Sequence, residues 1–283
     1  QNGVLVSEAS VPSTTLIQSG RLYAEVNGIR DTGVAIANPD TQPANITFFF
    51  TDAAGADFGQ GSLVLPPGSQ IARFLDQPPF NSGNSVSGTF TFNSSVPVSI
   101  ISLRGYVNER SEFLITTMPV GPVVETSTNP IVFPHYADGG GWTTQIVLVN
   151  STEQAAAGSA DFFGPGSQRL GYNIAPRSAT VLRTAGSAPA VQTGWVRVTP
   201  DSGTRTPTGV LIFSLRQNGV TVSEAGVPAS PMSTAFRLFV ESTGNISAGQ
   251  IGSVQTGVAL VNPSVSPVQV TFELANLSGT STG

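Results

Sequence analysis

The chain repeats itself, and the repeat limits what it can fold into. The segment QNGVLVSEASVP at residues 1–12 returns as QNGVTVSEAGVP at 217–228. A second pair, TGVAIANP at 32–39 and TGVALVNP at 256–263, has a similar separation. A more diverged copy, TTQIVLVNS, lies between them at 143–151. A unit of roughly 110 residues therefore recurs along the chain.

A repeated asparagine marks the same point in each copy. Asn150 stands 112 positions after Asn38 and 112 positions before Asn262. Because Asn and Pro favour turns, we expect each Asn to end a strand and cap the following turn with its side chain. The repeat predicts a terminal strand of a preceding copy, two complete β-sandwich repeats and one incomplete repeat, at residues 1–12, 13–120, 121–229 and 230–283.

Each copy has the pattern of short β-strands. Segments such as ANITFFFTD and VSIISL are rich in β-branched and aromatic residues and are bounded by Gly, Pro, Asn or Asp. Phe48 and Phe50 alternate with Thr47, Phe49 and Thr51, which is the period of a strand with one buried face. The same alternation of Val268, Val270 and Phe272 with polar residues predicts a strand in the last copy. About seven strands in each unit of this size are typical of a sandwich. We predict an all-β chain of tandem immunoglobulin-like β-sandwich domains.

Composition excludes several function classes. The chain of 283 residues has no Cys and no Lys, and its net charge is -5. The absence of Cys rules out disulfides and thiolate metal sites, and the absence of Lys rules out Schiff-base chemistry. The few dispersed arginines form no basic stripe for nucleic acid, and no apolar run is long enough to cross a membrane. We expect no cofactor and no metal.

One loop carries the residues that could bind a ligand. His135 is the only histidine, and it lies in FPHYADGGGW beside Tyr136, Asp138 and Trp142. His135 and Asp138 could form an acid–base pair, and Trp142 could offer a sugar a flat ring. The alternative is an ordinary polar loop, with Trp142 and Trp195 filling the core. No nucleophile motif accompanies the loop, so we expect no enzyme and assign His135, Tyr136 and Trp142 to ligand binding at most.

Two further sets of polar residues give predictions. Five N-x-S/T sequons could carry N-linked glycans, and they lie at Asn45, Asn93, Asn150, Asn245 and Asn276. Arg104 and Arg216 recur in the S-L-R motif, and we expect them to pair with Glu112 and Glu224 across hairpins. Exposed pairs of that kind contribute under about 1 kcal/mol.

The motif-bearing segments have a family resemblance. PHYADGGGWTTQIVLVN, followed one copy later by TGVALVNPS, resembles repetitive secreted bacterial β-repeat proteins that carry ADGGGW and VNPS-type motifs. The resemblance implies an extracytoplasmic β-repeat protein and brings no catalytic residues. The first and third copies lack ADGGGW and would be divergent members.

Repetition with few candidate site residues favours a structural role. We expect an extracellular or cell-surface protein whose repeats build a stalk, fibre or filament, with self-association, and with strand exchange between subunits as one route. In that route residues 1–12 donate a strand to the incomplete repeat at 230–283. The alternatives are a carbohydrate- or ligand-binding accessory module and an adhesin.

Overall fold

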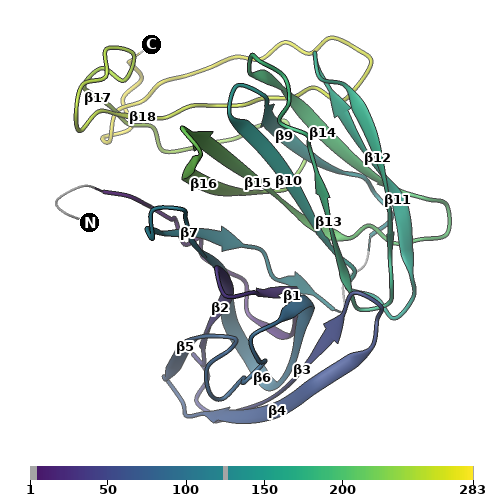
Figure 1. Ribbon diagram of the computed structural model, residues 1–283. Helices are drawn as coiled ribbons and strands as arrows, with labels where there is room; N and C mark the ends of the chain where they lie inside the picture. The colour runs from purple at the N-terminus through teal and green to yellow at the C-terminus, as the bar shows by residue number, and fades with distance from the viewer. Residues whose placement is uncertain (1–4, 124–126, 283) are drawn as a thin grey trace. The chain divides into compact units, whose positions relative to one another are not determined.

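The computed structural model describes residues 5–123 and 127–282. It divides into two compact units, Gln1–Phe236 and Arg237–Gly283, and each is considered by itself. Antiparallel strands form the regular structure, and the described residues contain no helix (Figure 1). The predicted all-β class is confirmed. None of these residues forms a helix of the length and hydropathy that a membrane span requires.

The first β-module comprises eight strands in one continuous sheet. The strands are β1 (Ile17–Val26), β2 (Arg30–Ala37), β3 (Ala44–Asp52), β4 (Asp57–Leu65), β5 (Gln70–Phe74), β6 (Val86–Val107), β7 (Phe113–Met118) and β8 (Gly121–Pro122). Their order is β4-β3-β6-β1-β2-β5, with β7 paired to β6 and β8 paired to β1.

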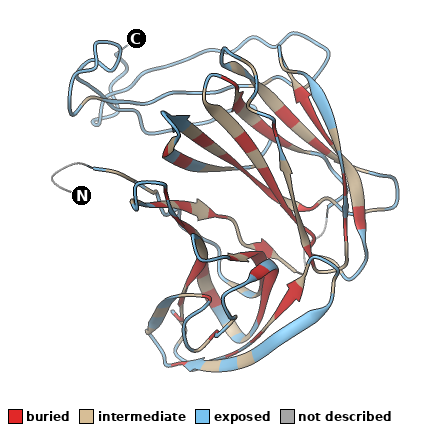
Figure 2. Cartoon of the chain, in the orientation of Figure 1, coloured by how far each residue is buried: buried red, intermediate tan, exposed pale blue. Residues whose placement is uncertain are grey.

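Strand β6 joins two layers of the first module. Its residues 86–94 pair with β1 and β3, and its residues 99–106 pair with β2 and β7. The sheet therefore wraps over its own apolar face, in the manner of a β-sandwich. In β3 the side chains of Phe48 and Phe50 are buried and that of Thr47 is exposed, so the predicted alternation is confirmed here. Figure 2 shows such buried and exposed positions alternating along the strands.

The second β-module has the same arrangement in two separate sheets. Its strands are β9 (Ile131–Asp138), β10 (Trp142–Val149), β11 (Ala156–Phe163), β12 (Gln168–Ile174), β13 (Ala179–Arg183), β14 (Gln192–Pro200), β15 (Thr208–Gln217) and β16 (Val220–Pro228). One sheet has the order β12-β11-β14-β9 and the other β13-β10-β15-β16. Side chains from both sheets, including Phe133, Ile146, Phe162 and Leu211, form one buried cluster.

The two modules match strand by strand. The order β4-β3-β6-β1 corresponds to β12-β11-β14-β9, and β5-β2-β6-β7 corresponds to β13-β10-β15-β16. The one long strand β6 is thus the counterpart of β14 and β15, which a turn at Asp201–Thr204 separates. The sequence repeat therefore has a structural counterpart. Each module has eight strand segments in these sheets where about seven were expected.

The second unit departs from the strand pattern that its sequence predicts. Between residues 237 and 282 its only strands are the two-residue β17 (Ser242–Thr243) and β18 (Val254–Gln255), and Val268, Val270 and Phe272 lie in no strand. By the repeat, residues 268–274 correspond to β3, which pairs with β6 in the first module. The described residues of this unit include no counterpart of β6, and a strand without partners is not stable in water. Phe272 is consequently 73% exposed.

Candidate functional site

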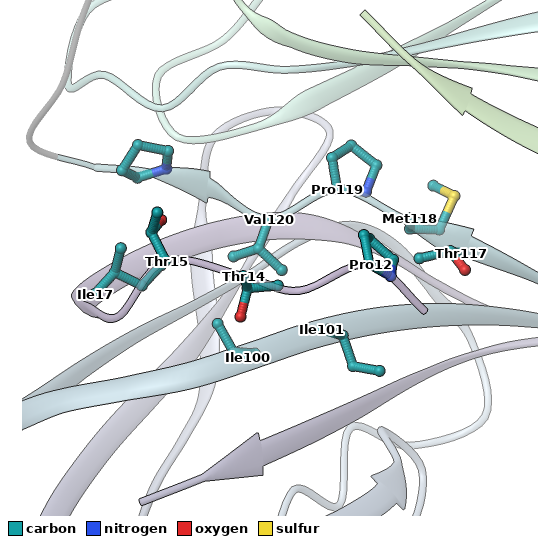
Figure 3. A pocket seen from close by; sticks show the side chains of 11 residues that line it. Pro12, Thr14, Thr15, Ile17, Ile100, Ile101, Thr117, Met118, Pro119 and Val120 are labelled. Carbon is teal, nitrogen blue, oxygen red and sulfur yellow. The ribbon is translucent and has the colours of Figure 1, made fainter. Parts of the chain in front are cut away.

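A small cleft lies beside the N-terminal segment. It has a volume of about 160 Å³ and is mainly apolar (Figure 3). The cleft is lined by Pro12, Thr14, Thr15, Ile17, Ile100, Ile101, Thr117, Met118, Pro119, Val120 and Pro122. This volume is below the roughly 300–1,000 Å³ of most small-molecule sites, and no charged side chain lines it. It provides no acid, base or nucleophile.

The structure removes one of the three residues predicted to bind a ligand from the surface. Tyr136 is fully buried in the core of the second module, where its ring packs edge-on against Phe162 at 5.1 Å between centroids. Burial raises the pKa of the Tyr136 hydroxyl, and the nearby Asp138 raises it further. The His135 and Trp142 side chains are half-buried. A stacking platform needs an exposed ring face, so the ligand-binding prediction now depends on His135 and Trp142.

The acid–base pair suggested by the sequence is not formed. The carboxylate of Asp138 accepts a hydrogen bond from the backbone N–H of Gly186 at 2.9 Å. The His135 ring instead packs edge-on against Phe213, with centroids 5.6 Å apart. Asp138 therefore fixes a loop, and His135 covers part of the second module's core.

The glycine triplet of ADGGGW forms the β9–β10 hairpin. Gly139, Gly140 and Gly141 all have positive φ, from 60° to 92°. A side chain at Gly139 would also collide with the backbone carbonyl of Ala190. Consecutive residues in this region of φ/ψ space are accessible only to glycine without strain. The most specific part of the family resemblance is thus explained by a turn.

The repeated asparagines have an internal structural role. The side-chain amide of Asn150 donates to the carbonyls of Gln154 at 2.7 Å and Ala175 at 3.0 Å, and it joins two loops of the second module. Asn38 does the same in the first module, donating to Gln42 and Leu65. Both are 1% exposed. The predicted turn-capping role is confirmed.

The remaining sequons lie on the surface. Asn45 and Asn93 are exposed on the neighbouring strands β3 and β6, and Asn245 and Asn276 are exposed in the second unit. These four side chains are sterically open to a glycan, whereas the buried Asn150 amide is already bonded. Glycosylation itself stays a prediction.

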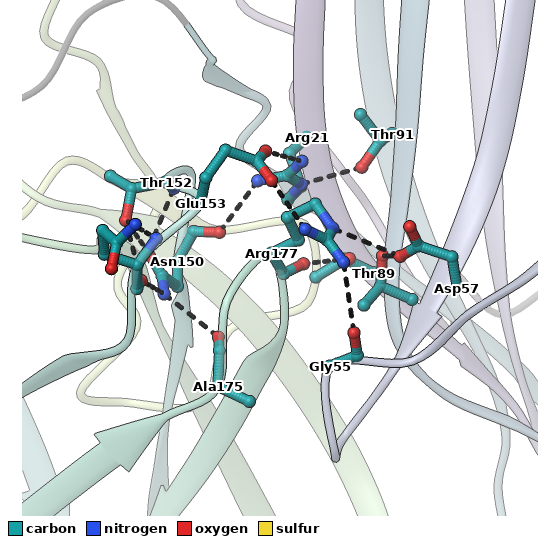
Figure 4. Close-up of polar contacts among 12 residues, drawn as sticks. Arg21, Gly55, Asp57, Thr89, Thr91, Asn150, Thr152, Glu153, Ala175 and Arg177 are labelled. Atoms are coloured by element: carbon teal, nitrogen blue, oxygen red, sulfur yellow. Dashed lines mark hydrogen bonds and ion pairs between the residues drawn. The ribbon is translucent and has the colours of Figure 1, made fainter.

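The most strongly organised polar cluster joins the two β-modules (Figure 4). Arg21 of β1 is 1% exposed, and its Nε donates to the hydroxyl of Thr91 at 2.7 Å. Its Nη1 donates across the junction to the carbonyl of Asn150 at 3.2 Å, and Glu153 lies 3.8 Å from its Nη2. Burial lowers the pKa of Arg21 to about 10, with Glu153 acting in the opposite direction. At neutral pH the module junction therefore holds a buried, charged guanidinium.

Arg177 makes the matching contacts from the second module. Its Nη1 donates to Glu153 at 2.6 Å, its Nε donates to Asp57 at 3.2 Å, and its Nη2 donates to the Gly55 carbonyl at 3.3 Å. The Arg177 carbonyl accepts from the hydroxyl of Thr89. Through these bonds Arg177 links the β12–β13 turn of the second module to the β3–β4 turn of the first.

An apolar cluster lies in the same junction. Tyr23 of β1 and Met118 of β7 pack against β10 and β15 of the second module. All members of this cluster are at most 5% exposed, and they are Tyr23, Met118, Val147, Val149, Val210 and Ile212. Burial raises the pKa of the Tyr23 hydroxyl. Hydrophobic contact of this kind restricts relative motion of domains.

A second polar cluster completes the junction. Arg104 of β6, which is 2% exposed, forms ion pairs with Glu25 of its own module at 3.2 Å and with Glu224 of β16. Glu224 also accepts from the hydroxyl of Ser214 at 3.0 Å. The predicted hairpin pair between Arg104 and Glu112 is wrong, because the Arg104 side chain lies on the face of β6 that meets the neighbouring module.

The other predicted hairpin pair is wrong as well. Arg216 lies 3.4 Å from Glu109 of the first module, and the partner of Glu112 is Arg110 at 2.8 Å. The register of β15 with β16 explains this, because it places Ser214, not Arg216, opposite Glu224.

The β6–β7 hairpin also covers an edge of the second module. The Asn108 amide donates to the Thr221 carbonyl at 2.9 Å, and Glu109 accepts from the Thr221 backbone N–H at 2.8 Å. The backbone N–H of Gly226 donates to the hydroxyl of Thr116. Strand β16 is an edge strand of its sheet, so these bonds satisfy backbone groups that would otherwise be open to another chain.

The sequence predictions missed Arg21 and Arg177. A signal for Arg21 was present, because RLYAE at residues 21–25 returns as RLFVE at 237–241. An arginine in the middle of an apolar strand indicates a buried ion pair or an interface. No comparable signal identifies Arg177, which lies in a turn with a positive φ of 62°.

Comparisons with known proteins identify no relative whose function could be compared with this geometry. No family model matches the chain, and no curated protein matches it. Six chains of solved structures match. One is titled "Crystal Structure of Thermotoga maritima 1070"; it is 16% identical, covers 37% of this chain and 92% of its own, and has a TM-score of 0.32. A likeness at this TM-score supports no statement about fold or function.

Proposed function

We propose that the chain is a structural extracellular protein whose tandem modules build a surface stalk, fibre or filament. The modules are immunoglobulin-like in the sense that two antiparallel layers, formed by one wrapped sheet in the first module and by two sheets in the second, face each other in roughly 100 residues, with a strand order of their own. The resemblance of the ADGGGW segment to secreted β-repeat proteins supports the extracellular placement. We expect no catalytic activity.

The observation that carries the proposal is the junction between the modules. An apolar cluster containing Tyr23 and Ile212 is flanked by the buried arginines Arg21 and Arg104. A flexible tether between independent domains would not bury charged groups, because desolvation costs several kcal/mol per ion unless partners are held in place. The junction therefore supports a stiff connection, which an array that bears mechanical force requires.

Electron microscopy of negatively stained protein tests the proposal. We expect elongated assemblies in preparations of the full chain. The variant Arg21→Ala should give shorter or more strongly bent assemblies, because it removes the bonds to Asn150 and Thr91. The matched control is Arg169→Ala, since Arg169 is 72% exposed and pairs only within its own module. Isolated particles at every concentration would exclude the structural role.

A carbohydrate-binding module is the second candidate. It is favoured by the half-buried rings of Trp142 and His135, which retain exposed surface in the second module. A glycan array should then show binding that Trp142→Ala abolishes and Trp195→Ala preserves. Trp195 is a suitable control because its ring stacks on Phe163 at 4.0 Å between centroids. An unchanged glycan profile in both variants would exclude this candidate.

A further inference from the structure

The outer edge of β7 holds the N-terminal segment of the chain. Strand β7 pairs with β6 along one edge only. Along the other edge, the Ile115 backbone N–H donates to the Ser7 hydroxyl at 3.0 Å, and Ser7 returns a longer bond to the Ile115 carbonyl at 3.5 Å. Further along, the Thr117 hydroxyl donates to the Ser10 carbonyl. The segment therefore runs in the same direction as β7.

This segment is held weakly. Residues 5–16 form no strand, and each hydrogen bond to β7 uses a side chain on one partner. Leu5 and Val11 are 77% and 59% exposed. The cleft of about 160 Å³ lies where the segment leaves β7, between Pro12 and Ile101 (Figure 3). Few buried contacts and exposed bonds are the features of a segment that opens at low cost.

The sequence of this segment is repeated in β16, a strand of the second module that lies against β7. SEASVP at residues 7–12 matches SEAGVP at 223–228 in β16. Ser10 and Gly226 occupy equivalent positions in these two copies. They bond to the adjacent β7 residues Thr117 and Thr116, respectively. Strand β7 thus contacts the S-E-A-x-V-P motif twice, from two parts of the chain.

We propose that the outer edge of β7 is a strand-acceptor site whose partner is residues 5–12 of a second copy of this chain. The contacts made by the segment are the same whether it belongs to the same copy or to another. Exchange therefore requires only that the short connection at residues 13–16 reorient, and it is favoured where copies are crowded. Each copy can donate one segment and accept one, so the exchange can be repeated from copy to copy. This inference rests on the proposed structural role and gives it a molecular contact.

The acceptor differs from the one predicted from sequence. The strand that residues 7–12 resemble is β16, and β16 pairs with β15. The described residues of the second unit contain no counterpart of β15, so they lack the strand that such a donor would join. The outer edge of β7, in contrast, already binds the motif.

Engineered disulfides test the exchange, because the chain has no cysteine of its own. Copies carrying only Ser10→Cys are mixed with copies carrying only Thr117→Cys and oxidised at increasing concentration. We expect a disulfide between the two kinds of copy, in a yield that rises with concentration. The control is Ser85→Cys in place of Thr117→Cys, since Ser85 is exposed in the loop between β5 and β6, and it should give no such disulfide. The double variant Ser10→Cys/Thr117→Cys should give a ladder of cross-linked oligomers.

Two outcomes overturn the proposal. The first is a double variant that closes only within each copy at every concentration, with the mixed single variants remaining monomeric. The second is equal cross-linking to the Ser85→Cys control, which would show random collision. Microscopy of the same samples separates the two proposals. Assemblies without cross-links between copies would support the structural role and exclude strand exchange. Cross-linked dimers without assemblies would support strand exchange and exclude the structural role.

Discussion

Arg104 and Glu224 form an ion pair across the junction of the two modules, although they are 120 positions apart in the chain. Their side chains are 2% and 3% exposed. Glu25 lies on the other side of the same guanidinium, so Arg104 connects one carboxylate of its own module with one of the next. The ion pair should therefore contribute to the free energy of unfolding of the two modules.

Loss of Arg104 should destabilise the protein strongly. We expect Arg104→Met to lower the free energy of unfolding by about 3–5 kcal/mol, because it leaves the buried carboxylate of Glu224 and the partly buried carboxylate of Glu25 without a cationic partner. Arg110→Gln is the matched control in the same hairpin, since Arg110 is 52% exposed, and it should cost less than about 1 kcal/mol. Urea denaturation measures both values. Equal losses in the two variants would contradict the buried role of Arg104.

The apolar part of the junction should couple the unfolding of the modules. Ile212 is fully buried against Tyr23 and Met118 of the first module. We expect Ile212→Ala to cost about 2–5 kcal/mol and to split one calorimetric transition into two. Ile174→Ala removes the same atoms from the core of the second module alone and should preserve a single transition. A split transition in Ile174→Ala, or none in Ile212→Ala, would count against coupling at this surface.

Replacing the buried Asn150 should lower the stability of the fold, and replacing the exposed Asn93 should not. Asn150→Ala removes the buried amide that bonds the Gln154 and Ala175 carbonyls, and each hydrogen bond lost costs about 0.5–1.5 kcal/mol. Asn93→Ala removes an exposed side chain and should change the melting temperature little. Thermal unfolding followed by circular dichroism tests the contrast, which fails if both variants melt alike.

Stability should fall as pH rises toward neutrality. Burial raises the pKa of Asp31 to about 7, and the adjacent carboxyl of Asp76 adds to the effect. The unfolded chain releases this proton near the ordinary value of 3.8, whereas the folded chain retains it. Between about pH 4 and pH 7 the folded state therefore binds more protons, and the free energy of unfolding decreases.

The variant Asp31→Asn checks that pH dependence. It keeps the shape of the side chain and cannot titrate, so its unfolding free energy should change less between pH 4 and pH 7 than that of the wild type. Asp40→Asn alters a half-buried carboxyl in the β2–β3 turn, beyond the other end of β2, and serves as the control. A wild-type slope that survives in Asp31→Asn would assign the effect to other groups.

The exposed sequons should accept a glycan in the folded protein, whereas the buried sequon at Asn150 should not. In a host that adds N-linked glycans, we expect mass spectrometry of the folded fraction to find glycan at Asn45 and Asn93. Asn150 should be unmodified in that fraction, because a glycan there would remove a buried amide from its three carbonyl partners. Folded protein glycosylated at Asn150 would show that this turn rearranges.

The turn-capping role of Asn38 and Asn150 could be predicted from the sequence, because the Asn side chain makes its bonds within short loops. The burial of Phe48 and Phe50 likewise followed from a two-residue period. The partners of Arg104 and Arg216 could not be predicted, since a hairpin register shift and the approach of another module decide them. The strand expected at 268–272 did not form for a related reason, because the described residues of the second unit contain no counterpart of β6 with which it could pair.

The amino-acid sequence alone determined the all-β class, the repeat and the turn-capping asparagines, because these depend on local backbone preference and on periodic burial. Tertiary structure decided which charges are buried, how the modules join at Arg21, Arg104 and Tyr23, and that β7 holds the segment at residues 5–12. Those features depend on surfaces that meet only after each module has folded. The charged side chains lose their contact with water only when the two modules pack together.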